Sequence, residues 1–164
     1  MSDDKERLLS AQWILERNLS WIMAAEVKVG VIVAVDSALL GSLGASFSSS
    51  SAFICTSWTC LWLVCSGAAI IAGLFCAAMA VLPRLEGPES SLIYFGRVAA
   101  LDRPDYINQL KRATDMELLD DLSAQVHQNA LIACKKFAWV RLSMYCSFFS
   151  ITPWFASIVT LLQK

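Results

Sequence analysis

Runs of apolar residues long enough to cross a bilayer occur three times along the chain, at 27–47, 54–82 and 142–162. A transmembrane helix requires about 20 mostly apolar residues, and each run meets that requirement. The second run contains no charged residue, whereas the first contains Lys28 and Asp36. We therefore predict an all-α membrane protein with three transmembrane helices and a cytosolic helical segment between the second and the third.

Composition agrees with this pattern. Hydrophobic residues make up 57% of the 164 residues and charged residues 16%, with a mean hydropathy of +0.56. Soluble domains have roughly 45–50% apolar and about 25% charged residues. The predicted organisation is an amphipathic cytosolic N-terminal helix (1–26), a transmembrane hairpin (27–82), a cytosolic regulatory segment (83–141) and a third transmembrane helix (142–162).

The distribution of Lys and Arg predicts the orientation, because these residues gather in cytosolic loops. Four of them lie at or before the first run, and none lies between the first two runs. The segment between the second and third runs carries eight: Arg84, Arg97, Arg103, Lys111, Arg112, Lys135, Lys136 and Arg141. We expect an inner-membrane protein with a cytosolic N-terminus, a cytosolic segment 83–141 and an outer C-terminus.

Helix signals are strong in the second half of this segment. Asp102 is placed as an N-cap with Pro104 in the first turn, and Thr114 and Glu117 form a capping box. No helix-breaking residue follows until Pro153, so a continuous helix of about 60 Å is predicted from about residue 115. Residues 91–101 fit either a short strand or a docked helix.

No motif for catalysis, metal binding or a cofactor is present. The chain has no Walker loop, nucleophile elbow or HExxH sequence, and its one histidine, His127, falls on a polar helical surface. The six cysteines form no CxxC pair, which favours small apolar thiols over a zinc site. A net charge of −1 gives no indication of nucleic-acid binding. We therefore expect a protein that is not an enzyme.

Aromatic and basic side chains cluster within nineteen residues of the cytosolic segment. A nucleotide pocket needs a cation for the phosphate and a flat ring for the base, and the cluster provides both. The alternative is ordinary packing combined with the positive charge of a cytosolic loop. The members of the cluster are Tyr94, Phe95, Arg97, Arg103, Tyr106, Lys111 and Arg112.

Asp36 is the unusual residue of the first run, because a charge at the bilayer centre costs on the order of 2.5–3.5 kcal/mol. Glu26 and Lys28 lie at the cytosolic boundary and can reach water. Asp36 must instead be uncharged or meet a polar partner, and Thr59, Ser143 and Ser147 offer hydroxyls. It lies about 200° around the helix from Ala34, so it faces away from a stripe of small residues.

That stripe is one of two with a small residue at every fourth position. Such stripes allow close helix packing in membranes, within one chain or between chains. The first consists of Gly30, Ala34, Ala38 and Ser42, and the second of Cys65, Ala69, Gly73 and Ala77.

Several segments together resemble a known family, the Pycsar transmembrane effectors of bacterial anti-phage defence. They are the opening helix "AEVKVGVIVAVDSALL", a second run ending in "PRL", the segment "LIYFGRVAAL", a Pro-Asp-Tyr helix and the lead "KKFAWVR". The family usually has Asp-x-Lys where this chain has Glu26-Val27-Lys28. Asp36 matches the acidic residue expected further along that helix.

The resemblance implies an effector that is activated by cyclic UMP or cyclic CMP and impairs the inner membrane. We expect Arg97 and Arg103 to contact the phosphate and Tyr94 or Tyr106 the base. Glu26, Lys28 and Asp36 would act within a homo-oligomer in the bilayer. The alternative function is a constitutive structural or partner-binding membrane protein.

Overall fold

The computed structural model describes residues 3–49, 57–83, 87–88 and 90–162, and these residues form helices without any strand. The helices are α1 (Asp3–Ser49), α2 (Ser57–Val81), α3 (Phe95–Val98), α4 (Arg103–Arg112) and α5 (Asp115–Leu162). Helices α1, α2 and α5 are long and apolar enough to cross a membrane. The predicted all-α fold with three transmembrane helices is thereby confirmed.

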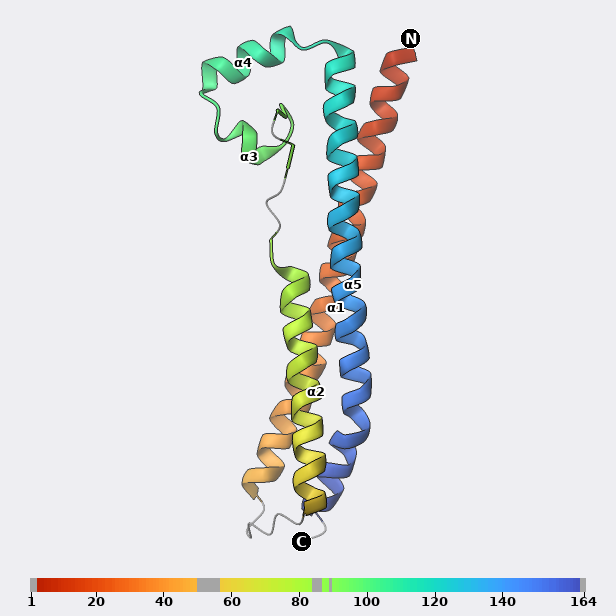
Figure 1. Cartoon of the computed structure of the whole chain (residues 1–164), viewed down its shortest axis with the longest axis vertical. Helices are drawn as coiled ribbons and strands as arrows, with labels where there is room; N and C mark the ends of the chain where they lie inside the picture. Colours follow the sequence, from red (N-terminus) through yellow and green to blue (C-terminus); the bar gives the residue numbers. More distant parts are fainter. Residues whose placement is uncertain (1–2, 50–56, 84–86, 89, 163–164) are drawn as a thin grey trace. The chain divides into compact units, whose positions relative to one another are not determined.

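The chain forms two compact units. Helices α1 and α5 (Figure 1) each contribute residues to both of them. The first, here called the α3–α4 unit, comprises Met1–Ala24 and Pro83–Lys135. The second, here called the α2 unit, comprises Ala25–Leu82 and Lys136–Lys164.

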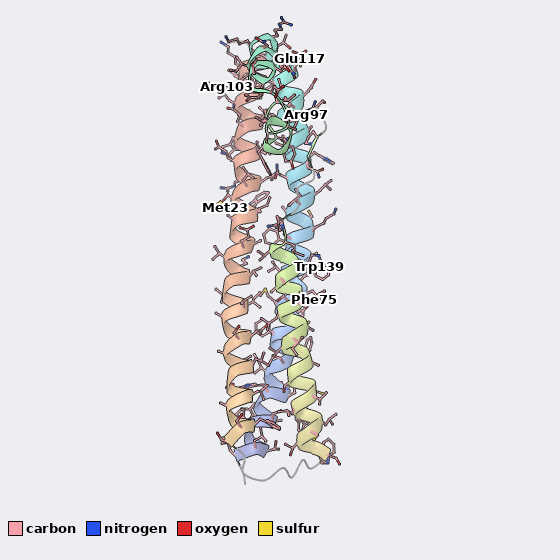
Figure 2. The ribbon with its side chains drawn as sticks, turned by 90° about the vertical axis from the view of Figure 1, so that its left-hand side faces the viewer. Met23, Phe75, Arg97, Arg103, Glu117 and Trp139 are labelled. Atoms are coloured by element: carbon pink, nitrogen blue, oxygen red, sulfur yellow. The ribbon has the colours of Figure 1, made fainter. Side chains whose placement is uncertain are left out.

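In the α2 unit, parts of α1, α2 and α5 bury a narrow core of small residues. Ala25 and Val29 of α1 pack with Ala77 and Ala80 of α2 and with Val140 of α5. Large apolar side chains such as that of Phe75 project outward along the helices (Figure 2) and are exposed. Small residues inside and large ones outside are the arrangement expected of helices that pack closely in lipid.

In the α3–α4 unit, the first part of α1 lies beside the first part of α5. Asn18 is buried on α1 and donates a hydrogen bond from Nδ2 to the carbonyl oxygen of Val126 on α5, at 3.1 Å. Ala11 and Leu122 are buried in the same unit. The segment 91–101, which the sequence left open between strand and helix, contains the short helix α3.

Helix α5 begins as the sequence predicts. The backbone amide of Thr114 donates to Oε2 of Glu117 at 2.8 Å, and the amide of Glu117 donates back to Oγ1 of Thr114 at 3.3 Å. This reciprocal pair is a capping box. At α4, Asp102 occupies the predicted N-cap position, but its side chain makes no capping hydrogen bond.

Helix α5 is not interrupted by Pro153, which lies inside the predicted third transmembrane helix. It runs through Pro153 to Leu162, although proline lacks the amide that the ladder needs. Proline is tolerated inside transmembrane helices, where neighbouring helices and small local adjustments satisfy the carbonyl that loses its partner. Residues 50–56 lie outside the described residues, and they include most of the predicted connection between the first two transmembrane helices and Cys55 of the second apolar run. Arg84 also lies outside the described residues.

Candidate functional site

A cavity of about 310 Å³ lies in the α3–α4 unit between α1, α5 and the segment that leads into α3. Its polar lining comes from Tyr94 and from three amide side chains of α5, Gln125, Gln128 and Asn129. The remaining lining residues are apolar, and Leu15 is one of those contributed by α1. The lining of the cavity therefore includes aromatic and amide side chains but no charged residue.

The ring of Tyr94 is held closely by two glycines. A Cβ atom added to Gly96 would lie 2.7 Å from Cε1 of Tyr94, and a Cβ on Gly87 would collide with the same ring. Since real Cβ atoms do not approach so closely, a side chain at either position would displace the ring. The ring of Phe95 is also near, with its centroid 4.9 Å from that of Tyr94.

Ser91 organises the segment that carries Tyr94. It is buried, and its Oγ accepts hydrogen bonds from the backbone amides of Ile93 and Tyr94 at 3.0 and 2.8 Å. The same oxygen accepts from Nε2 of Gln125 at 3.2 Å. Through Ser91, α5 and the segment before α3 are joined at the edge of the cavity.

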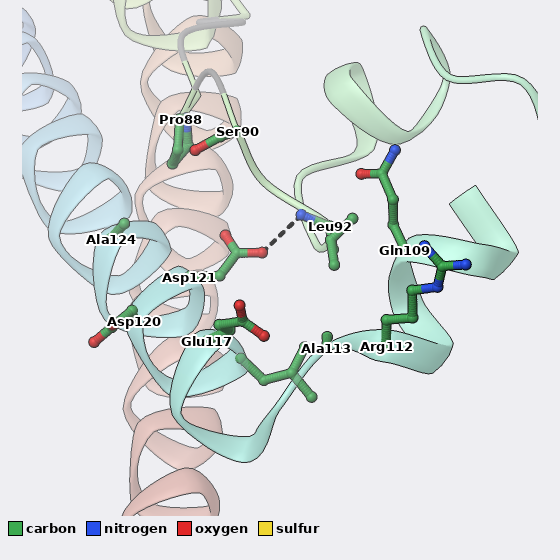
Figure 3. Close-up of a pocket in the computed structure, with 11 residues that line it drawn as sticks. Pro88, Ser90, Leu92, Gln109, Arg112, Ala113, Glu117, Asp120, Asp121 and Ala124 are labelled. Atoms are coloured by element: carbon green, nitrogen blue, oxygen red, sulfur yellow. Dashed lines mark hydrogen bonds between the residues drawn. The ribbon is translucent and has the colours of Figure 1, made fainter. Parts of the chain in front are cut away.

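A second cavity of about 560 Å³ lies in the same unit, between α4 and the beginning of α5 (Figure 3). Its one basic lining residue, Arg112, is outnumbered by the carboxylates of Glu117, Asp120 and Asp121. The amide of Leu92 donates to Oδ2 of Asp121 at 2.7 Å (Figure 3). This acidic lining disfavours an anionic ligand.

Glu117 is fixed by its partner in the capping box. The backbone amide of Thr114, and then its hydroxyl, donate to the Glu117 carboxylate and lower its pKa below the ordinary value. The carboxylate is thus ionised at neutral pH, at the helix end where negative charge is favourable.

The residues of the predicted nucleotide cluster do not all line the same cavity. Tyr94 lines the smaller cavity, but Arg97, Arg103 and Tyr106 line neither of the two cavities. Arg97 lies on α3 and Arg103 begins α4, and both are exposed (Figure 2).

Asp36 is completely buried inside the three helices of the α2 unit, with an exposed fraction of 0%. Its Oδ2 accepts a hydrogen bond from Oγ of Ser147 at 2.9 Å, and Ser147 is one of the three hydroxyl partners that the sequence offered. A Cβ on Gly73 would lie 2.7 Å from this oxygen. Among the described residues, the other oxygen, Oδ1, has no hydrogen-bond partner. Ala34 is exposed whereas Asp36 is buried, so the two residues lie on different faces of α1, as the sequence predicts.

Glu26 and Lys28, the other two residues proposed for the membrane region, both contact α5. Oε1 of Glu26 lies 2.6 Å from Nζ of Lys136, whose side chain is 7% exposed, against 47% for that of Glu26. The ammonium of Lys28 lies 5.5 Å from the ring centroid of Phe137, within the range of a cation–π interaction. These contacts satisfy charges that would otherwise be costly near a bilayer.

Sequence reasoning missed a buried polar stripe along α5. Lys136, Ser143, Ser150 and Ser157 are all buried and recur at every seventh position. The heptad spacing is a signal that could have revealed them, because it places residues on one packed face. The cavity amides gave no comparable signal. The cysteines also differ in part from the prediction of thiols throughout, since Cys60 forms a disulfide bond.

Comparison with known proteins agrees with this architecture. Residues 10–163 match the family described as the Pycsar effector protein domain. No curated protein sequence and no solved structure is significantly similar to the chain. Because the match covers nearly the whole chain, including all three transmembrane helices, the protein belongs to the Pycsar effector family.

Proposed function

We propose that this Pycsar membrane effector is activated by a cyclic pyrimidine nucleotide, cyclic UMP or cyclic CMP, and then impairs the bacterial inner membrane to abort phage infection. The observation that carries the proposal is the family match over residues 10–163, on a chain with three membrane-spanning helices. Membrane localisation follows from the same observation. The activating ligand and the membrane damage are the proposed part.

The proposed ligand site lies in the α3–α4 unit. Tyr94 supports the assignment, because its ring borders a cavity of ligand size. Arg97 and Arg103 are proposed to contact the phosphate, and their exposure leaves both guanidinium groups accessible to an anion. Tyr106, which is half-buried on α4, remains the second candidate for contact with the base.

The proposed response takes place in the α2 unit. Ligand binding would rearrange α5, which runs without interruption from Asp115 to Leu162. The bond between Ser147 and Asp36 and the ion pair between Lys136 and Glu26 both join α5 to α1. A movement of α5 must therefore either break these contacts or move α1 with it, and in both cases α1 would repack.

A homo-oligomer is proposed as the active form. The first small-residue stripe supports it, because Gly30, Ala34 and Ala38 are exposed on α1 and nothing lies within 4 Å of a Cβ built on Gly30. Such a face permits close approach of a second helix. The distribution of Lys and Arg supports an orientation with the N-terminus and residues 83–141 in the cytosol and the C-terminus outside.

Isothermal titration of the detergent-purified protein tests the ligand. We expect heat from cyclic UMP or cyclic CMP and none from cyclic AMP, which serves as the matched control nucleotide. Arg97→Ala and Arg103→Ala should weaken binding, because each removes a charge proposed for the phosphate. The absence of heat with both pyrimidine nucleotides, in a folded sample, would refute the proposal.

A further inference from the structure

The smaller cavity of the α3–α4 unit has the size and chemistry of a site for one flat, uncharged heterocycle. Its volume of about 310 Å³ is at the lower end of the range of small-molecule sites, roughly 300–1,000 Å³. Leu19, Ile93 and Phe95 border it and are exposed, so the cavity is accessible from the surface. A ring can therefore enter while its substituents remain outside.

The hydrogen-bonding groups of the cavity are oriented by the protein itself. Asn129 donates from Nδ2 to the backbone carbonyl of Gln125 at 2.9 Å. Because that carbonyl can only accept, the amide of Asn129 is fixed with its Oδ1 as the remaining acceptor. Gln125 is 6% exposed and is held by Ser91 at 3.2 Å. Fixed amides of this kind can distinguish the donor and acceptor edge of a ring.

Tyr94 provides an aromatic group at the same cavity. Its ring lies close to Gly87 and Gly96, where only glycine leaves it room. Stacking of a base on an aromatic side chain is a common source of affinity for nucleic-acid bases.

The charged residues near the two cavities indicate different places for the base and for the phosphate of the ligand. The lining of the smaller cavity contains no charged residue, so it offers no countercharge to a phosphate. The larger cavity carries three carboxylates against one arginine and repels an anion. Arg97 follows Phe95 by two residues on α3 and is exposed. It is the basic residue on the same short segment as Tyr94 and Phe95, which line the smaller cavity.

We infer that the cavity bounded by Tyr94, Gln125, Gln128 and Asn129 binds the base of the activating nucleotide, while the cyclic phosphate stays outside it on the side of Arg97. This assignment rests on the proposed function for the identity of the ligand. It replaces Tyr106 by three amides of α5 as the groups that read the base. It also implies that the nucleoside without its phosphate competes for the site.

The test compares two identical substitutions in the same unit. Asn129→Leu removes an amide from the cavity, whereas Asn108→Leu removes an exposed amide on α4 that does not line it. Loss of one buried hydrogen bond should weaken binding of cyclic UMP or cyclic CMP by roughly five- to 150-fold in Asn129→Leu. Asn108→Leu should bind as the wild type does. A second variant, Leu19→Trp, fills the cavity from its exposed border and should weaken binding similarly.

Competition separates a base site from a merely structural role. Uridine or cytidine, present in excess, should reduce the apparent affinity of the wild type for the cyclic nucleotide and should have a smaller effect on Asn129→Leu. If the wild type binds but Asn129→Leu and Leu19→Trp bind equally well, the base assignment is wrong and the proposed function stands. If the wild type binds neither cyclic nucleotide, the proposed function fails and the base assignment fails with it.

Discussion

Gly73 provides the sharpest structural test of the environment of Asp36. A Cβ at this position would lie 2.7 Å from Oδ2 of Asp36 and 3.3 Å from Oγ of Ser147. In Gly73→Ala, the carboxylate must move or the helices of the α2 unit must separate. Gly67 offers a matched control on the same helix, because nothing lies within 4 Å of a Cβ built there.

The expected magnitude follows from two opposing terms. Replacing glycine by alanine inside a helix stabilises it by about 1 kcal/mol, and this gain applies to both positions. Overpacking of a close-packed interior costs about 1–3 kcal/mol, and this cost applies to Gly73 alone. The free energy of unfolding should therefore be about 1–3 kcal/mol lower in Gly73→Ala than in Gly67→Ala.

Reversible unfolding in mixed detergent micelles, followed by far-UV circular dichroism, measures this difference. Asp36→Ala provides the second arm of a double-mutant cycle, because it removes the atom closest to the new methyl group. In the Asp36→Ala background, Gly73→Ala should lose most of its cost, with a coupling energy of about 1–3 kcal/mol. Equal stabilities of Gly73→Ala and Gly67→Ala would show that Asp36 does not pack against α2 as described.

Three further predictions concern single contacts. The bonds from Thr114 lower the pKa of Glu117, so the capping box should stabilise the first turn of α5 fully above the ordinary glutamate pKa and lose this effect as the pH falls through the lower, folded-state value. In amide hydrogen exchange, the first turn of α5 should be less protected in Glu117→Ala than in the wild type at neutral pH, and equally protected in acid. Equal protection at neutral pH would contradict this prediction. Glu26→Gln should lower the free energy of unfolding by on the order of 1–3 kcal/mol, because it leaves the buried Lys136 ammonium without its counterion. Lys136→Met should lower it by less. The reverse order in the unfolding assay would refute the assignment of Lys136 as the buried residue of the ion pair. Asp36→Ala should abolish the loss of membrane potential in cells that express an active pyrimidine cyclase while leaving nucleotide affinity unchanged; a variant that remains fully toxic would reduce Asp36 to a packing residue.

Features specified by neighbouring residues were predictable from the sequence. Thr114 and Glu117 are three residues apart, so their pairing and the start of α5 could be read directly. The apolar runs likewise predicted the three transmembrane helices. Asp102 shows the limit of such reasoning, since its position is correct but its side chain makes no hydrogen bond to the helix.

Features that depend on the register between distant helices were not predictable. Composition offered Thr59, Ser143 and Ser147 as partners for Asp36, but only the packing of α1 against α5 selects Ser147. The smaller cavity combines residues of α1, of the segment before α3 and of α5. No local pattern connects those segments. The cluster inferred from sequence proximity therefore shares Tyr94 with the cavity lining but contains none of the amide residues of α5.

In the proposed function, a cyclic pyrimidine nucleotide switches this protein from a harmless to a damaging state in the membrane. Dye release from liposomes that contain the purified protein tests it most directly. We predict release on addition of cyclic UMP or cyclic CMP, and no release with cyclic AMP or without nucleotide. Equal release in all samples, or none in any of them, would show that cyclic pyrimidine nucleotides do not activate the protein.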